Sequence, residues 1–175
     1  ARRGRRPRGA VQCAAYCPVA HPAATQPEPA YEPYFRAEAV AGLARYTNGP
    51  RDLLDLLHRR SSPFPTNLEP LAAPGGEHGW PVLVFSHGLA GCMEMSSQFC
   101  AHLASLGYVG LALEHEDGSG CYAERPIPDG GAPSPIYYTS PPEGFVYGRE
   151  SVVDFRAPFL DARVSDVERV LRLLD

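Results

Sequence analysis

The chain has 175 residues, which suffices for one domain with a substantial hydrophobic core. Its formal net charge is −4 at pH 7 and all 16 basic residues are arginines, so no general basic surface for nucleic acid is expected. The five cysteines are odd in number and irregularly spaced, which argues against a disulfide framework and against a zinc-finger ligand set. Reduced thiols favour a cytoplasmic protein.

The N-terminal region bears on localisation. Arginines crowd residues 1–9, which we expect to be a disordered tail, the alternative being a targeting arm or a contact with an anionic membrane. Residues 10–20 resemble a signal peptide only faintly, because Gln12, Tyr16 and Pro18 interrupt the apolar run. No run reaches the roughly 18 apolar residues of a membrane-spanning helix, so we expect peripheral membrane contact at most. The first residue is not methionine, which is compatible with a truncated start.

The first half of the chain predicts a short strand and two helices. A strand is expected over residues 11–16. Apolar residues at near-helical spacing predict a helix over 34–46, which Asn48-Gly49-Pro50 ends. Asp52 could cap a second short helix. That helix should bury four leucines on one side: Leu53, Leu54, Leu56 and Leu57. Residues 61–79 are rich in proline and glycine and predict a loop.

The clearest element is the apolar run Val82–Phe85, which lies between Pro81 and a turn containing His87 and Gly88. It predicts a strand buried on both faces. A buried strand followed by His-Gly is how an α/β hydrolase builds half of its oxyanion hole, because the loop offers a backbone N–H to the carbonyl oxygen under attack. Gly88 has no Cβ, so a substrate oxygen can approach the backbone there.

A strand–helix–strand unit should follow. Residues 94–106 predict a helix, and Gly107 suits its C-terminal cap. Its apolar face would be formed by Met95, Phe99, Leu103 and Leu106. Residues 108–113 predict the next strand, parallel to the first. The loop 114–120 would then lie at the carboxyl end of the sheet, where ligand sites gather.

The last third contains a long loop and a helix. Residues 121–156 are rich in proline and predict an excursion over the site or a surface loop. Apolar spacing predicts a helix over 160–174, capped by Asp161 or by a box of Ser165 and Glu168. No Gly-x-Ser-x-Gly nucleophile elbow occurs anywhere in the sequence. We therefore expect the chain to stop before the nucleophile strand.

Three stretches carry a family resemblance: Phe85-Ser86-His87-Gly88-Leu89, then residues 103–108, and then Glu114-His115-Glu116-Asp117-Gly118-Ser119. Together they resemble the platelet-activating factor acetylhydrolases, which are serine esterases of the phospholipase A2 type with the α/β-hydrolase fold. The similarity spans most of the chain and is most specific over residues 80–119. The chain departs from the family pattern at Glu116, where arginine is more usual, and at Gly91-Cys92.

The resemblance implies an α/β fold with a mostly parallel sheet and flanking helices. Residues 10–175 would be the N-terminal part of a single α/β-hydrolase domain. The backbone N–H of Leu89 would be one oxyanion-hole donor, and the catalytic Ser, Asp and His would lie beyond Asp175. The implied substrate is a phospholipid with an acetyl or short acyl group at sn-2, cleaved by serine acyl transfer without metal or organic cofactor. The isolated chain would be inactive.

Two other functions stay open: another α/β-hydrolase esterase, such as a dienelactone-hydrolase-like enzyme, and a non-catalytic hydrolase-like interaction protein. Several residues also have structural interpretations, which we favour. His87 would hydrogen-bond its loop rather than act as a base. Residues 114–117 would form a solvated loop rather than ligate a metal. Asp154 and Asp161 would be caps or surface charges. The last set comprises aromatic side chains that would pack against the long loop at least as readily as against lipid: Tyr137, Tyr138, Phe145 and Tyr147.

Overall fold

A computed structural model of the chain describes residues 10–20, 28–66, 68–74, 79–126 and 132–174. The predicted disordered tail, residues 1–9, lies outside the described residues. In chain order the elements are β1 (Gln12–Tyr16), α1 (Ala37–Thr47), α2 (Arg51–Arg59), β2 (Val82–Ser86), the 3-10 helix η1 (Met93–Ser96), α3 (Ser97–Ser105), β3 (Val109–Glu114), β4 (Tyr122–Arg125), β5 (Ser134–Tyr137) and α4 (Arg149–Leu174).

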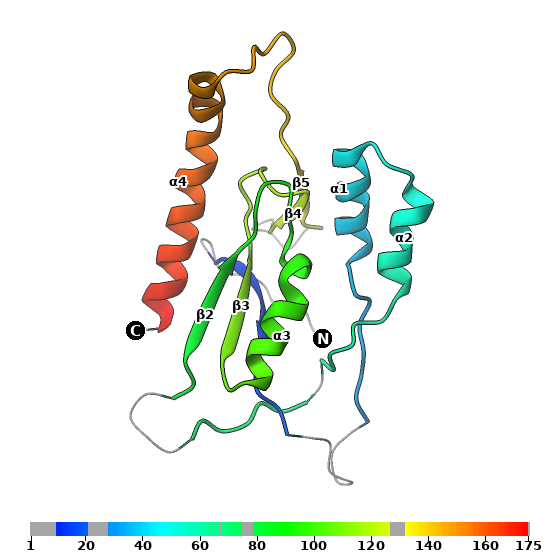
Figure 1. Cartoon of the computed structure of the whole chain (residues 1–175), viewed down its shortest axis with the longest axis vertical. Helices are drawn as coiled ribbons and strands as arrows, with labels where there is room; N and C mark the ends of the chain where they lie inside the picture. Colours follow the sequence, from blue (N-terminus) through cyan, green and yellow to red (C-terminus); the bar gives the residue numbers. More distant parts are fainter. Residues whose placement is uncertain (1–9, 21–27, 67, 75–78, 127–131, 175) are drawn as a thin grey trace.

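The centre of the molecule is a three-stranded mixed sheet with the order β1-β3-β2 (Figure 1). β2 and β3 pair in parallel, with Ser86 opposite Leu113, and α3 lies between them in the chain. The predicted strand–helix–strand unit is therefore confirmed. β1 pairs antiparallel with the other edge of β3, which confirms the strand predicted over residues 11–16. The carboxyl ends of β2 and β3 lie at the same edge of the sheet, because the two strands are parallel.

Strand β2 is less buried than its sequence predicts. Val82 is 43% exposed, and Ser86 at the other end is also exposed. Among the described residues β2 pairs only with β3, so one of its edges has no neighbouring strand. The prediction of a strand buried on both faces is therefore wrong, since a run of apolar residues does not reveal how many neighbours a strand has.

Helix α3 packs on the sheet through small side chains. The sequence predicted an inward face of large residues, but Phe99 is 52% exposed and Leu106 is 62% exposed, whereas Cys100 and Ala104 are buried. The reason lies in β3, where a Cβ added at Gly110 would meet the Cβ of Cys100 at 3.0 Å. Helix and strand approach too closely there for a large side chain. The first turn of the predicted helix is the 3-10 helix η1.

Helices α1 and α2 form a pair beside the sheet (Figure 1). Asn48 ends α1 in the left-handed conformation with φ 50°, which confirms the predicted stop. The residue before α2 is Pro50, so Asp52 lies in the first turn and is not the cap. The prediction that α2 buries four leucines on one side is wrong. Leu54 and Leu57 pack against the core, while the other two are exposed, because neighbouring residues point to different sides of a helix.

The buried core cluster comprises Phe35, Ala39, Val40, Cys92, Cys121 and Tyr122.

The region predicted as a long loop contains regular structure. Strands β4 and β5 form a separate antiparallel pair, with Tyr122 opposite Tyr137. Helix α4 begins at Arg149, well before the predicted start, and continues through Pro158, so Asp161 and Ser165 are internal residues rather than caps. Figure 1 shows α4 lying alongside β2. Among the helices of the described part of the chain, none is both long and apolar enough to cross a membrane.

Candidate active site

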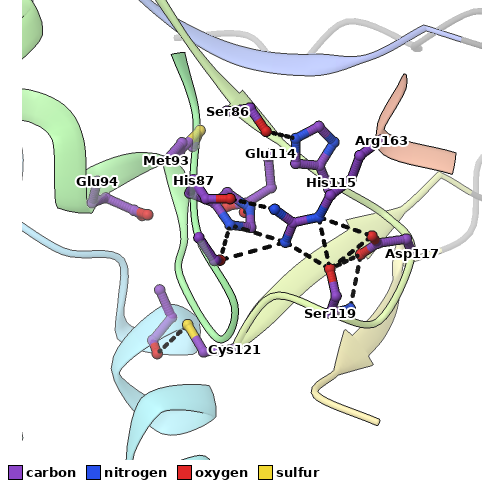
Figure 2. A network of polar contacts seen from close by, with 12 residues as sticks. Ser86, His87, Met93, Glu94, Glu114, His115, Asp117, Ser119, Cys121 and Arg163 are labelled. Atoms are coloured by element: carbon purple, nitrogen blue, oxygen red, sulfur yellow. Dashed lines mark hydrogen bonds and ion pairs between the residues drawn. The ribbon is translucent and has the colours of Figure 1, made fainter. Parts of the chain in front are cut away.

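Two loops meet at the carboxyl ends of β2 and β3: residues 87–91 and residues 115–121 (Figure 2). The amide of Ala90 donates to the carbonyl oxygen of Ser119 at 2.7 Å, and the amide of Cys121 donates to that of Gly91 at 3.0 Å. A Cβ added at Gly120 would meet the carbonyl oxygen of Gly91 at 3.0 Å and the His87 ring at 3.2 Å. The two loops are therefore pressed together by backbone contacts.

The carbonyl oxygen of Gly88 is held from two sides within its own loop. The Nδ1 atom of His87 lies 2.9 Å from it, and the amide of Gly91 donates to it at 3.0 Å. His87 itself is 3% exposed, so its role as a structural histidine that hydrogen-bonds the loop agrees with our interpretation. A hydrogen on Nδ1 makes the shorter contact a hydrogen bond, because a carbonyl oxygen only accepts, while Nη2 of Arg163 lies 3.4 Å from the same nitrogen.

Leu89 follows in the same loop and is 55% exposed. Its backbone N–H donates no hydrogen bond to any residue that the structure describes. A donor without a partner in an exposed residue just after a strand can donate a hydrogen bond to a ligand oxygen.

Arg163 reaches from α4 into the junction of the two loops (Figure 2). Its guanidinium donates to the carbonyl oxygen of His87 and, at 3.4 Å, to that of Gly88. It also donates to the Ser119 hydroxyl at 2.6 Å and forms an ion pair with Asp117 at 3.2 Å. The arginine side chain is only 12% exposed, so these contacts lie largely away from water.

Ser86, His115 and Asp166 form a hydrogen-bonded line from β2 to α4. The Ser86 hydroxyl lies 2.9 Å from Nε2 of His115, and Nδ1 of His115 lies 2.9 Å from Oδ2 of Asp166. An ionised carboxylate only accepts, so Nδ1 donates to Asp166, and in the neutral ring Nε2 then accepts a hydrogen bond from the Ser86 hydroxyl. These are the contacts of a Ser-His-Asp triad. However, Ser86 is the last residue of an extended strand, and the non-glycine residues with positive φ in the described chain are Asn48 and Ala90. Ser86 thus does not lie on a strained nucleophile turn.

A second buried cluster joins α1 to the sheet. Arg36 pairs with Glu94 of η1 and with Glu114 at the end of β3. Burial alone would raise the pKa of Glu94, but hydrogen bonds and Coulomb attraction from Arg36 outweigh it and lower the pKa. Burial would lower the pKa of Arg36, and the same carboxylates raise it. Both groups are therefore charged at neutral pH.

The acidic stretch after β3 is not the solvated loop that we predicted. Glu114 is 1% exposed and His115 is fully buried, because each has a partner of its own: Arg36 for the first, and Ser86 with Asp166 for the second. Within the described part of the chain, no group of three or more His, Cys, Asp or Glu side chains is arranged to hold a metal ion.

Four charged residues of this site were not predicted from the sequence: Arg36, Glu94, Arg163 and Asp166. Each lies on a helix or just before one, and its partner in the site is far away in the sequence. A weak signal existed, since a charged residue on the sheet-facing side of an amphipathic helix needs a buried partner. The aromatic residues of the long loop behave differently from one another: Tyr137 packs against Tyr122, whereas Tyr147 is 75% exposed. Contact with a membrane stays a prediction.

Comparisons with known proteins agree on one class. The family described as platelet-activating factor acetylhydrolase, isoform II, matches residues 11–175 of the chain. A protein of Schizosaccharomyces pombe described as a putative phospholipase A2 is 51% identical over 39 residues. That match covers 22% of this chain and 9% of the relative, so it spans only a small part of that protein's length.

Proposed function

This chain belongs to the family of platelet-activating factor acetylhydrolases, isoform II, and on that premise we propose that it supplies the oxyanion loop of a lipid ester hydrolase with the α/β-hydrolase fold. The proposed substrate is a phospholipid with an acetyl or short acyl group at sn-2. The observation that carries the proposal is the backbone N–H of Leu89, which is free of hydrogen bonds to described residues and follows buried His87 and exposed Gly88.

In the proposed reaction, a serine activated by histidine attacks the sn-2 ester carbonyl. The carbonyl oxygen becomes negatively charged, and the Leu89 N–H donates a hydrogen bond to it. A second backbone N–H would complete the oxyanion hole. The lysophospholipid leaves with the proton that histidine took from serine. Water then attacks the acyl-serine and releases the carboxylic acid.

The nucleophile is proposed to lie outside these 175 residues. The sequence contains no Gly-x-Ser-x-Gly, and Ser86 lies in a strand rather than on a nucleophile turn. Strand β2 supports this arrangement, because its edge away from β3 has no strand partner among the described residues. A parallel strand on that edge would bring its own carboxyl end next to Leu89.

Replacing Leu89 tests the proposal in the full-length protein. Leu89→Pro removes the N–H, whereas Leu89→Ala keeps it and serves as the matched control. Loss of one oxyanion donor should lower the kcat of Leu89→Pro about 100- to 1,000-fold relative to Leu89→Ala. Equal kcat values in two folded variants would contradict the role of Leu89.

Substrate preference distinguishes the proposed phospholipid esterase from a general carboxylesterase. The kcat/KM of the wild-type protein is measured for a phospholipid with an sn-2 acetyl group and for a simple ester of the same acid. Preference for the phospholipid supports the proposal. Preference for the simple ester would indicate a dienelactone-hydrolase-like or other carboxylesterase instead.

A further inference from the structure

We propose that Arg163 is a positioning residue for the oxyanion loop, and that it holds the peptide between Gly88 and Leu89 so that the Leu89 N–H faces the substrate. The inference rests on the proposed ester hydrolysis. It concerns a residue of α4, far in sequence from the loop that it controls.

The argument begins with the planarity of one peptide group. The carbonyl of Gly88 and the N–H of Leu89 belong to the same peptide, and in a trans peptide they point in opposite directions. Fixing the carbonyl oxygen therefore fixes the direction of the N–H. Three nitrogen atoms converge on that oxygen: Nδ1 of His87 at 2.9 Å, the amide of Gly91 at 3.0 Å and Nη2 of Arg163 at 3.4 Å.

Side-chain packing at Gly88 does not hold this peptide. A Cβ added at Gly88 would meet no described atom within 4 Å, so space is open on that side of the residue. Gly88 also has no side chain of its own to restrict rotation of the backbone. Hydrogen bonds to the carbonyl groups restrain the peptide instead. Arg163 binds two successive carbonyls, those of His87 and Gly88, and this fixes the peptide on both sides of Gly88.

Arg163 is itself held firmly on its other side. Its Nε donates to the Ser119 hydroxyl at 2.9 Å and to Asp117 at 3.2 Å, and the Asp117 side chain is only 2% exposed. The arginine thus bridges the loop after β3 and the loop after β2, and its hydrogen bonds fix the position of one loop relative to the other. Bridging the two loops in this way needs a planar group with several donors, and the lysine ammonium group cannot replace it.

The positive charge of Arg163, like its hydrogen bonds, should strengthen the hydrogen bond that the Leu89 N–H donates to the substrate. A cation beside a carbonyl oxygen polarises the peptide and makes its N–H a better donor. The effect matters most when the substrate oxygen becomes negative in the transition state. Arg163 should therefore contribute to kcat more than to substrate binding.

The test uses Arg163→Lys and Arg163→Gln in the full-length protein. Arg172→Gln is the matched control, because Arg172 lies on the same helix with 65% of its side chain exposed. We expect both Arg163 variants to lose about tenfold or more in kcat, with KM changed by less than about threefold. Their affinity for a trifluoromethyl ketone analogue of the phospholipid, which mimics the tetrahedral intermediate, should fall by a similar factor. Melting temperatures establish whether the variants are folded.

The outcomes separate this inference from the function on which it rests. If the wild-type protein hydrolyses no ester, the proposed function fails. If the wild-type protein is active and a folded Arg163→Gln variant keeps its kcat, the positioning role is overturned. The role is equally overturned if kcat is lost but affinity for the ketone is kept, or if neither Arg163 variant folds, because Arg163 would then be only structural.

Discussion

At the scale of single residues, the junction near the site depends on glycines that leave room for neighbouring backbone. Gly42 of α1 faces the end of the second loop and the start of β4, and a Cβ added there would lie 2.3 Å from the carbonyl oxygen of Cys121 and 2.9 Å from Cβ of Tyr122. Both atoms belong to the buried core region, since Cys121 and Tyr122 are almost fully buried. The helix can approach this segment only because Gly42 has no side chain.

Gly42→Ala should therefore destabilise the protein. Alanine favours a helix over glycine by about 1 kcal/mol, but a contact of 2.3 Å with backbone forces α1 away from the core and costs more, so we expect a net loss of about 1–3 kcal/mol. Urea unfolding measures the change. Gly148→Ala is the control, because its Cβ would meet only the Ser151 hydroxyl at 3.5 Å. A Gly42→Ala protein as stable as the wild type would contradict the close packing of α1.

At the scale of elements, buried charges join helices to the sheet. Arg36 stands just before α1 and binds Glu94 of η1 and Glu114 of β3, so one guanidinium links three elements. Asp166 of α4 similarly reaches β3 through His115. α4 needs this kind of link, since Val170 is its one buried residue among those described.

The link through Arg36 should make stability depend on pH. The pKa of Glu94 is lowered in the folded protein, so its ionised form stabilises the fold at every pH above its unfolded value of about 4.3. That contribution is lost as the pH falls through the lower folded pKa. Glu94→Gln should therefore cost about 2 kcal/mol of unfolding free energy at pH 7, and the difference from wild type should shrink below about pH 4. Chemical denaturation across this range measures both proteins.

The exposed Glu143 provides the control for this experiment. Glu143→Gln should leave the unfolding free energy near the wild-type value at each pH, because surface charges contribute little. A Glu94→Gln difference that stays constant down to pH 2 would show that Arg36 and Glu94 do not form an ion pair in solution.

At the scale of the whole molecule, the proposed reaction depends on where its serine nucleophile lies. We expect the purified 175-residue polypeptide to hydrolyse no short-chain ester, because the proposed oxyanion loop is present but no described serine lies on a nucleophile turn. A fluorogenic acetyl ester gives the assay. If the polypeptide is active, Ser86→Ala is compared with the control Ser105→Ala on α3. Loss of activity in Ser86→Ala alone would instead make Ser86, His115 and Asp166 a working triad.

The sequence by itself determined the local parts of this protein. Strand β2, the His-Gly turn, the helix and strand that follow, and the similarity to a family of lipid esterases could all be inferred from residues close together in the chain. Only the tertiary structure decided which side chains pack between the elements and which residues the buried charged side chains contact. Small residues such as Cys100 face the sheet because Gly110 allows close approach, and Arg163 reaches the Gly88 carbonyl across 75 residues of sequence. Periodicity describes one element at a time, whereas contacts between elements depend on how their surfaces fit in space.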